Sequence, residues 1–190
     1  MKTAHGHQII EVTGLGLTGS QEIKRLTEKG CKTNLYFGSH VEYLLDKERF
    51  HTAQEFNEKH LLDTGRAYKI GLVLGNELEK HVRSTRNILE IAERCGYKEA
   101  PAGVIPRLCE MMLEEKIWAL LKELGISIVT TLNSSPVEGY AYSKHALLAM
   151  HMFGETPRLD HHEFNRSVSL SECLWDNGEA FAFCLPENRS

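Results

Sequence analysis

The sequence predicts a single α+β domain in which a small antiparallel or mixed sheet packs on several helices and the chain ends in a β-hairpin. Several short segments alternate apolar and polar residues, as half-buried strands do, whereas others repeat apolar residues every three or four positions, as amphipathic helices do. No internal repeat or low-complexity linker divides the 190 residues, and a chain of this length can bury a core of its own. We therefore expect one domain covering residues 1–190, with a sheet that leaves one face open.

The first predicted elements are a strand at residues 8–12 and a charged helix at about residues 20–29. Thr18 and Gln21 have the spacing of a capping box, in which each side chain accepts a hydrogen bond from the other residue's backbone N–H. Gly30 suits the left-handed conformation that ends many helices. These signals indicate where the first helix begins and ends.

The middle of the chain predicts a short strand at residues 34–37, helical pieces within residues 40–62 and a clearer strand at residues 67–74. In this last segment the side chains fall on two faces with a period of two, which is typical of a half-buried strand. Asn76 follows as a good N-cap. A helix with its apolar residues on one stripe is therefore predicted over residues 78–92.

A second apolar helical region is predicted at residues 106–124. Pro106 suits its first turn, where the missing N–H costs nothing. We expect a break near Glu114 and an end at Gly125. The alternation that follows predicts a strand at residues 126–132.

The last part of the chain predicts a strand at residues 145–153, a polar loop at residues 154–165 and a C-terminal hairpin. The Asn-Gly pair at 177–178 is the dipeptide most typical of a two-residue hairpin turn. With this turn, Leu174 would oppose Phe181. The large apolar side chains of the hairpin would then share one face and pack on the helices.

Composition and charge exclude several classes of protein. The chain has 22 Lys and Arg against 26 Asp and Glu, a formal net charge of -4, so binding to nucleic acid through bulk charge is not expected. Its apolar runs are far shorter than the ~20 residues of a membrane-spanning helix, and no signal-peptide core is found. The five cysteines are scattered without a CxxC pair, which favours a reducing compartment, the cytoplasm.

The residues from Gly14 to Gly19 match the pattern G-x-G-x-x-G, after a predicted strand and before a predicted helix. In a dinucleotide site Gly14, Gly16 and Gly19 would allow a tight turn, close approach to pyrophosphate and close helix–strand packing. A second strand ending in an acid about 20 residues on is missing, because the nearest acid, Glu42, falls within a predicted helix. A nucleotide site and a glycine-rich turn before a capped helix both stay open.

Histidine is unusually frequent, with 10 in 190 residues. The candidate zinc ligands are His145, His151, His161 and His162, with Cys173 or Cys184 as a further ligand. Six residues of strand separate His145 from His151 by about 20 Å, and no H-x-x-x-H or C-x-x-C spacing supports zinc. The alternative is a set of scattered surface and loop histidines, and no other cofactor is predicted.

The sequence contains no complete catalytic constellation. No G-x-S-x-G nucleophile elbow is present. Cys95 and Cys109 lie on helical segments, where a cysteine is more often a small buried apolar residue than a nucleophile. Ser134 and Ser135 lie in a turn-rich loop, and turn chemistry explains them as well as function does. These observations favour a protein that is not an enzyme.

Several segments occur in order along the chain, at residues 13–19, 22–26, 68–76, 101–106 and 180–186, with Trp175 before the last. Together they resemble a group of short, uncharacterised bacterial proteins of about this length. The resemblance covers most of the chain. It implies no activity and no site residues, and it favours the interpretation of the glycine run as a feature of that group rather than of a Rossmann enzyme.

Two hypotheses of function follow. The first is a non-enzymatic interaction or binding module that self-associates or contacts another protein, with aromatic side chains available for the contact surface. The second is a small-ligand (nucleotide) or zinc-binding protein, with or without enzymatic activity, that uses the glycine turn or the C-terminal histidines. Metal analysis and ligand-induced stabilisation would separate the two.

Overall fold

The fold is described by a computed structural model, which covers residues 2–4, 6–33, 56–132, 146–154, 156–163 and 173–186. The helices are α1 (Gly19–Glu28), α4 (Thr85–Arg94), α5 (Val104–Leu113) and α6 (Trp118–Glu123), with short helical turns at Phe56–His60, Gly75–Glu77 and Lys80–Val82. The strands are β1 (Lys2–Ala4), β2 (His7–Thr13), β3 (Lys32–Thr33), β4 (Ala67–Leu74), β5 (Lys98–Glu99), β6 (Ile128–Thr130), β7 (Ala146–Phe153), β8 (Thr156–Glu163) and β9 (Glu179–Cys184). The strand predicted at residues 34–37 and the first part of the helical region predicted at residues 40–62, up to residue 55, lie outside the described residues.

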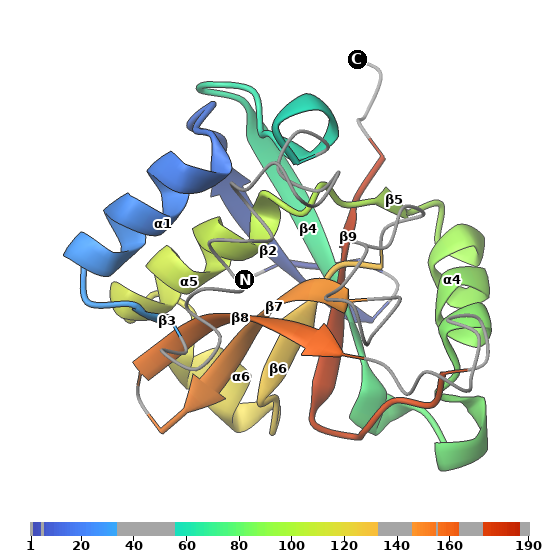
Figure 1. The fold of residues 1–190 in the computed structure, drawn as a ribbon. Helices are drawn as coiled ribbons and strands as arrows, with labels where there is room; N and C mark the ends of the chain where they lie inside the picture. The colour runs from blue at the N-terminus through green and yellow to red at the C-terminus, as the bar shows by residue number, and fades with distance from the viewer. Residues whose placement is uncertain are drawn as a thin grey trace.

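The nine strands form one mixed sheet in the order β1-β2-β4-β9-β6-β7-β8-β3, and β5 pairs with β9 off this path. The pairs β6–β9 and β3–β8 are parallel, and the other pairs are antiparallel. β9 and β4 run side by side through the middle of the molecule (Figure 1). The predicted α+β class with a mixed sheet packed on helices is confirmed.

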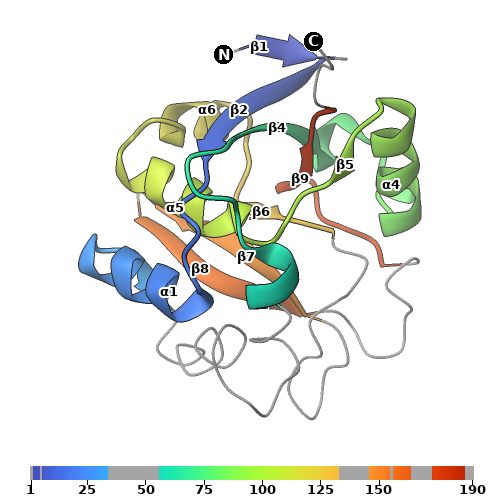
Figure 2. The same ribbon diagram turned by 90° about the horizontal axis from the view of Figure 1, so that it is seen from above.

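Helices cover both faces of the sheet. α1, α5 and α6 lie on one side and α4 lies on the other (Figures 1 and 2). Leu72 and Ala182 belong to the larger core, under α1, α5 and α6, which we name the α5-side core. Val73 and Phe181 pack with Ile88 of α4 in a second, α4-side core. The predicted open face is wrong, because the central strands carry buried apolar residues at successive positions.

Several predicted helix boundaries are confirmed. Thr18 and Gln21 form the capping box at the start of α1. Gly30 follows that helix with a φ of 88°, the left-handed region that favours glycine. The helical region at residues 106–124 is broken at Glu114, between α5 and α6, as expected.

The helix predicted over residues 78–92 begins later than expected. Ser84 is the N-cap of α4, and its Oγ accepts a hydrogen bond from the backbone N–H of Asn87 at 3.3 Å. Asn76 does not cap this helix, because its side-chain amide donates to the carbonyl oxygen of Leu124 at 2.6 Å. A tertiary contact therefore replaces the predicted local one.

The polar loop predicted at residues 154–165 is wrong, because most of it is strand β8. β7 and β8 form an antiparallel hairpin, with Phe153 opposite Thr156 next to the turn. β7 is apolar and buried, with Leu147, Leu148 and Met150 almost fully covered. Pairing with such a strand places a polar sequence in the sheet, which local propensity alone does not indicate.

The turn predicted at residues 177–178 is present, but the strand pairing predicted around it is wrong. β9 follows this turn and lies between β4 and β6, so Phe181 pairs with Val73 and Thr130. Leu174 instead forms an isolated bridge with Ser84. The buried positions of β9 thus join two strands from earlier in the chain rather than the segment just before the turn.

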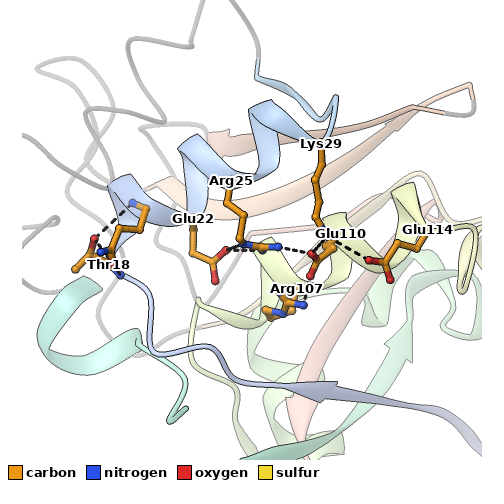
Figure 3. A network of polar contacts seen from close by, with 8 residues as sticks. Thr18, Glu22, Arg25, Lys29, Arg107, Glu110 and Glu114 are labelled. Atoms are coloured by element: carbon orange, nitrogen blue, oxygen red, sulfur yellow. Dashed lines mark hydrogen bonds and ion pairs between the residues drawn. The ribbon is translucent and has the colours of Figure 1, made fainter. Parts of the chain in front are cut away.

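A network of charges holds α1 on α5 (Figure 3). Glu110 on α5 contacts three cations, Arg25, Lys29 and Arg107. Arg25 also lies 2.6 Å from Glu22, on its own helix. Both glutamates are only 4% exposed. The two carboxylates can be buried here because cations surround them. Removal of one carboxylate would leave cations close to one another without a neutralising charge.

We predict that Glu110→Gln lowers the free energy of unfolding by about 3 kcal/mol, because three cations lose their shared carboxylate. Glu114→Gln is the matched control, since that side chain is 38% exposed and pairs with Lys29 at 3.3 Å. An exposed pair contributes about 0–1 kcal/mol. Urea unfolding of the two variants measures the difference, and equal losses would contradict this account of the network.

Candidate functional site

The glycine turn lies between β2 and α1 and packs on the segment that precedes β4. Its backbone N–H groups donate to that segment: Gly14 to Arg66 O at 2.9 Å, Gly16 to Leu62 O at 2.9 Å and Gly19 to Asn57 Oδ1 at 3.1 Å. A Cβ on Gly14 would lie 2.2 Å from the carbonyl oxygen of Asp63, which accounts for glycine at this position.

The backbone hydrogen bonds of the glycine turn determine which N–H groups a nucleotide could use. A pyrophosphate held by the turn would need free backbone N–H groups, and those of Gly14, Gly16 and Gly19 already have protein acceptors. The strands that flank α1 are also far apart in the sheet, since β2 is next to β4 and β3 pairs with β8. A dinucleotide-binding unit places these two strands side by side. The nucleotide site stays a prediction, and contacts within the protein account for glycine at positions 14 and 16.

The candidate zinc-binding histidines lie on two strands and on the segment before them. His145 lies outside the described residues. His151 lies in β7, and the register of β8 places the backbones of His161 and His162 about 10–13 Å from it along the sheet. Among the residues that the structure describes, no group of three His, Cys, Asp or Glu could hold a metal ion. The zinc site therefore also stays a prediction.

A notch opens in the sheet where β9 ends. β9 pairs with β4 and β5 as far as Cys184, and Leu185 then donates its backbone N–H to Lys69 O at 2.8 Å. Pro186 follows and has no N–H with which to continue the pairing. The start of β4 and the chain around β5 therefore face each other across about two strand spacings, roughly 10 Å.

This notch is a pocket of about 730 Å³. Its walls are the start of β4, the two residues of β5 with Pro101, the segment at 61–66 and the chain from Cys184 to Pro186. The segment at 61–66 accepts backbone hydrogen bonds from Gly14 and Gly16 of the glycine turn. The glycine turn thus positions one wall of the notch.

Asp63, Arg66 and Tyr68 form a polar cluster on that wall. Arg66 Nη1 lies 2.8 Å from Asp63 Oδ2, and the guanidinium carbon lies 5.0 Å from the centroid of the Tyr68 ring. The backbone N–H of Asp63 donates to Tyr68 Oη at 2.9 Å. Hydrogen bonds from Arg66 and then from Tyr68 lower the pKa of the Asp63 carboxyl. Asp63 is therefore ionised at neutral pH and offsets the charge of Arg66.

Cys184 is one of the residues that line the notch. Burial raises the pKa of this thiol to about 11, and the charge of Arg66 lowers it only in part. The thiolate is the nucleophilic and metal-binding form of cysteine. Because Cys184 is a neutral thiol at neutral pH, it adds a soft, weakly polar surface to the notch.

Lys69 and Lys98 also line the notch, and both are exposed. Neither makes an ion pair or a side-chain hydrogen bond with the part of the chain that the structure describes. With Arg66, they oppose Asp63 and Glu99, so three cations face two acids at the rim. The notch therefore has a small excess of positive charge, although the whole chain is acidic.

Apart from Cys184, the notch-lining residues were not among the predicted site residues. They come from segments more than 100 residues apart along the chain, which meet only through the pairing of β4, β9 and β5. One signal was available in the sequence, because the strand at residues 67–74 has its only polar side chains, Tyr68 and Lys69, near its start. The change from these polar side chains to apolar ones marks the point at which β4 leaves the core.

Comparison with known proteins supplies no relative that would assign a role to the notch. No protein-family model, no curated protein and no solved structure matches this chain. None of the described helices has the length and apolar character needed to span a bilayer.

Glu179, at the other end of β9, is a further group with a shifted pKa. It is 2% exposed, and its carboxylate accepts a hydrogen bond from the backbone N–H of Asp176 at 2.7 Å. Burial raises the pKa of this carboxyl to about 7; the hydrogen bond opposes the rise and the charge of Asp176 adds to it. The ionised form of Glu179 therefore destabilises the fold.

We predict a pH dependence of stability that Glu179 controls. The folded-state pKa lies near 7 against 4.5 for the free group, so the folded state binds more protons between these values and the free energy of unfolding falls as pH rises through them. Glu179→Gln should be more stable than the wild type by on the order of 2 kcal/mol at pH 8, relative to any difference at pH 4.

Urea unfolding at the two pH values measures this effect, with the exposed Glu123→Gln as the control. A Glu179→Gln variant whose stability relative to the wild type is the same at both pH values would contradict the assignment.

Proposed function

We propose that this chain is a non-enzymatic binding module that holds a small molecule in the notch beside the end of β9. The observation that carries the proposal is the pocket itself, about 730 Å³ in volume and lined by apolar, aromatic and charged side chains from four segments. Pockets of roughly 300–1,000 Å³ with a few placed polar groups are typical of small-molecule sites. Proteins of this kind bury most of the ligand and fix its orientation with the polar groups.

The state of the titratable groups supports binding over catalysis. A nucleophile needs a thiolate, and Cys184 is held as a thiol. A general acid needs a carboxyl that is protonated near neutral pH, and Asp63 has a lowered pKa. Asp63 and Cys184 are therefore better suited to recognise a ligand than to donate a proton to it or attack it.

A screen of small molecules by two-dimensional ¹H–¹⁵N NMR tests the proposal. We expect binders to perturb the backbone amides of residues 66–69, 98–99 and 184–185. Lys98→Trp should abolish these perturbations, because an indole at this exposed position fills the notch. Lys32→Trp is the matched control, since Lys32 is an exposed lysine of strand β3 that does not line the notch.

Binders that perturb amides elsewhere, or that bind the Lys98→Trp variant as well as the wild type, would contradict the proposal. A nucleotide that perturbs the glycine turn, or bound zinc in the purified protein, would favour the small-ligand and metal hypotheses for those other positions.

Protein contact is a second candidate function, and we propose it as self-association. Leu174 is 60% exposed beside the N-cap of α4, and Leu89 on that helix is 37% exposed. Sedimentation of the wild type should then give a dimer, and Leu174→Glu should shift it toward the monomer. A wild type that is monomeric at all concentrations would exclude this role.

We also propose a cytoplasmic location. All five cysteines are free thiols in the structure, and two of them, Cys31 and Cys109, are buried in the core. Free thiols in this number are typical of a reducing compartment.

A further inference from the structure

Three residues that are paired across neighbouring strands determine which side chains meet in the notch. Ile70, Cys184 and Lys98 are paired across β4, β9 and β5. Paired residues share a face of the sheet, and successive residues on a strand point to opposite faces. Because Ile70 and Cys184 pack on the α5-side core, Lys98 lies on that face. Lys69 precedes Ile70 and lies on the opposite, α4-side face.

The α5-side face of the notch has one charge that no described side chain offsets. Tyr68 lies on this face, since it packs on the α5-side core. Arg66 stacks on Tyr68 and is already paired with Asp63 at 2.8 Å, so that pair contributes little net charge. Lys98 makes no such pair with the residues that the structure describes. A ligand on this face therefore meets a single uncompensated ammonium group.

Apolar surface adjoins this ammonium group. Leu61 and Pro101 line the notch, and the ring of Tyr68 is covered by Arg66 on one side. A flat apolar group can lie against such surfaces, while a carboxylate or phosphate accepts a charge-assisted hydrogen bond from Lys98 Nζ. A neutral acceptor such as an amide oxygen would accept a weaker hydrogen bond from the ammonium group than a carboxylate or phosphate does.

We infer that the ligand of the notch is a small molecule with a flat apolar body and one carboxylate or phosphate group, and that Lys98 binds this anionic group. The inference rests on the proposed function and adds the chemical class of the ligand. Lys69, on the other face, takes no part in holding the anion.

Three probes of the same shape test this inference: 2-naphthoate, 2-naphthyl phosphate and the neutral 2-naphthamide. Their dissociation constants are measured by NMR titration on the full chain. We expect at least one of the two anions to bind about tenfold or more tightly than the amide, since hydrogen bonds to charged groups are the stronger ones. The preferred anion then tells carboxylate from phosphate.

Two lysine variants locate the contact. Lys98→Met should weaken binding of the preferred anion about tenfold and leave the amide unchanged, and Lys98→Arg should retain binding. Lys69→Met removes the same charge from the opposite face and should change affinity by less than about threefold. Both lysines are exposed, so the variants keep the fold, which circular dichroism checks.

Each other outcome overturns part of this account. Equal binding of the three probes in the notch would refute the anionic class and leave the proposed function in place. Equal losses in Lys69→Met and Lys98→Met would refute the role of Lys98, because only overall charge would then matter. Failure of all three probes to bind in the notch would overturn the inference, and the proposed function would fall with it if the wider screen also gave no binder in the notch.

Discussion

β9 pairs with three other strands, and the arrangement of the sheet and its two cores depends on those pairings. Its residues alternate between small and large. Ala180 and Ala182 face the α5-side core, whereas Phe181 and Phe183 fill the α4-side core. A strand with apolar residues on both faces can be buried only in the middle of a sheet that is covered on both sides. The position of β9 therefore accounts for helices on both faces.

The end of β9 determines where the notch lies. Pairing stops after Leu185 because Pro186 cannot donate a backbone hydrogen bond, and the start of β4 extends past that point with no β9 residue paired beside it. The notch is therefore a product of the same strand that organises the core. Its outer wall, the segment at 61–66, is fixed by hydrogen bonds from the glycine turn. A motif that suggested a nucleotide site thus supports the geometry of a different pocket.

Much of the fold could be predicted from the sequence where local chemistry decides it. The capping box at Thr18, the left-handed Gly30 and the break between α5 and α6 depend on neighbours in the chain, and all three are confirmed. The predictions were wrong where a contact with a distant part of the chain determines the local structure. Asn76 bonds to Leu124 instead of capping a helix, and β8 is a strand because it pairs with buried β7.

The candidate site depends on contacts between segments that are distant in the chain. No short motif contains it, because Tyr68, Lys98 and Cys184 meet only when β9 lies between β4 and β5. Correct pairing of β9 was not predictable from its flanking Asn-Gly turn, which is typical of a hairpin with the preceding segment. The glycine and histidine patterns can be found in the sequence because their residues lie close together along the chain. A pocket made by the end of one strand has no such signature.

The central claim is that this notch binds a small anion through Lys98. The most direct measurement is a crystal structure of the protein with 2-naphthyl phosphate or 2-naphthoate bound. Our account predicts the ligand between β4 and β5, with an anionic oxygen within hydrogen-bond distance of Lys98 Nζ and the ring system along Pro101 and Leu61. A ligand bound elsewhere, or seated in the notch with its anionic group pointing away from Lys98, would contradict it.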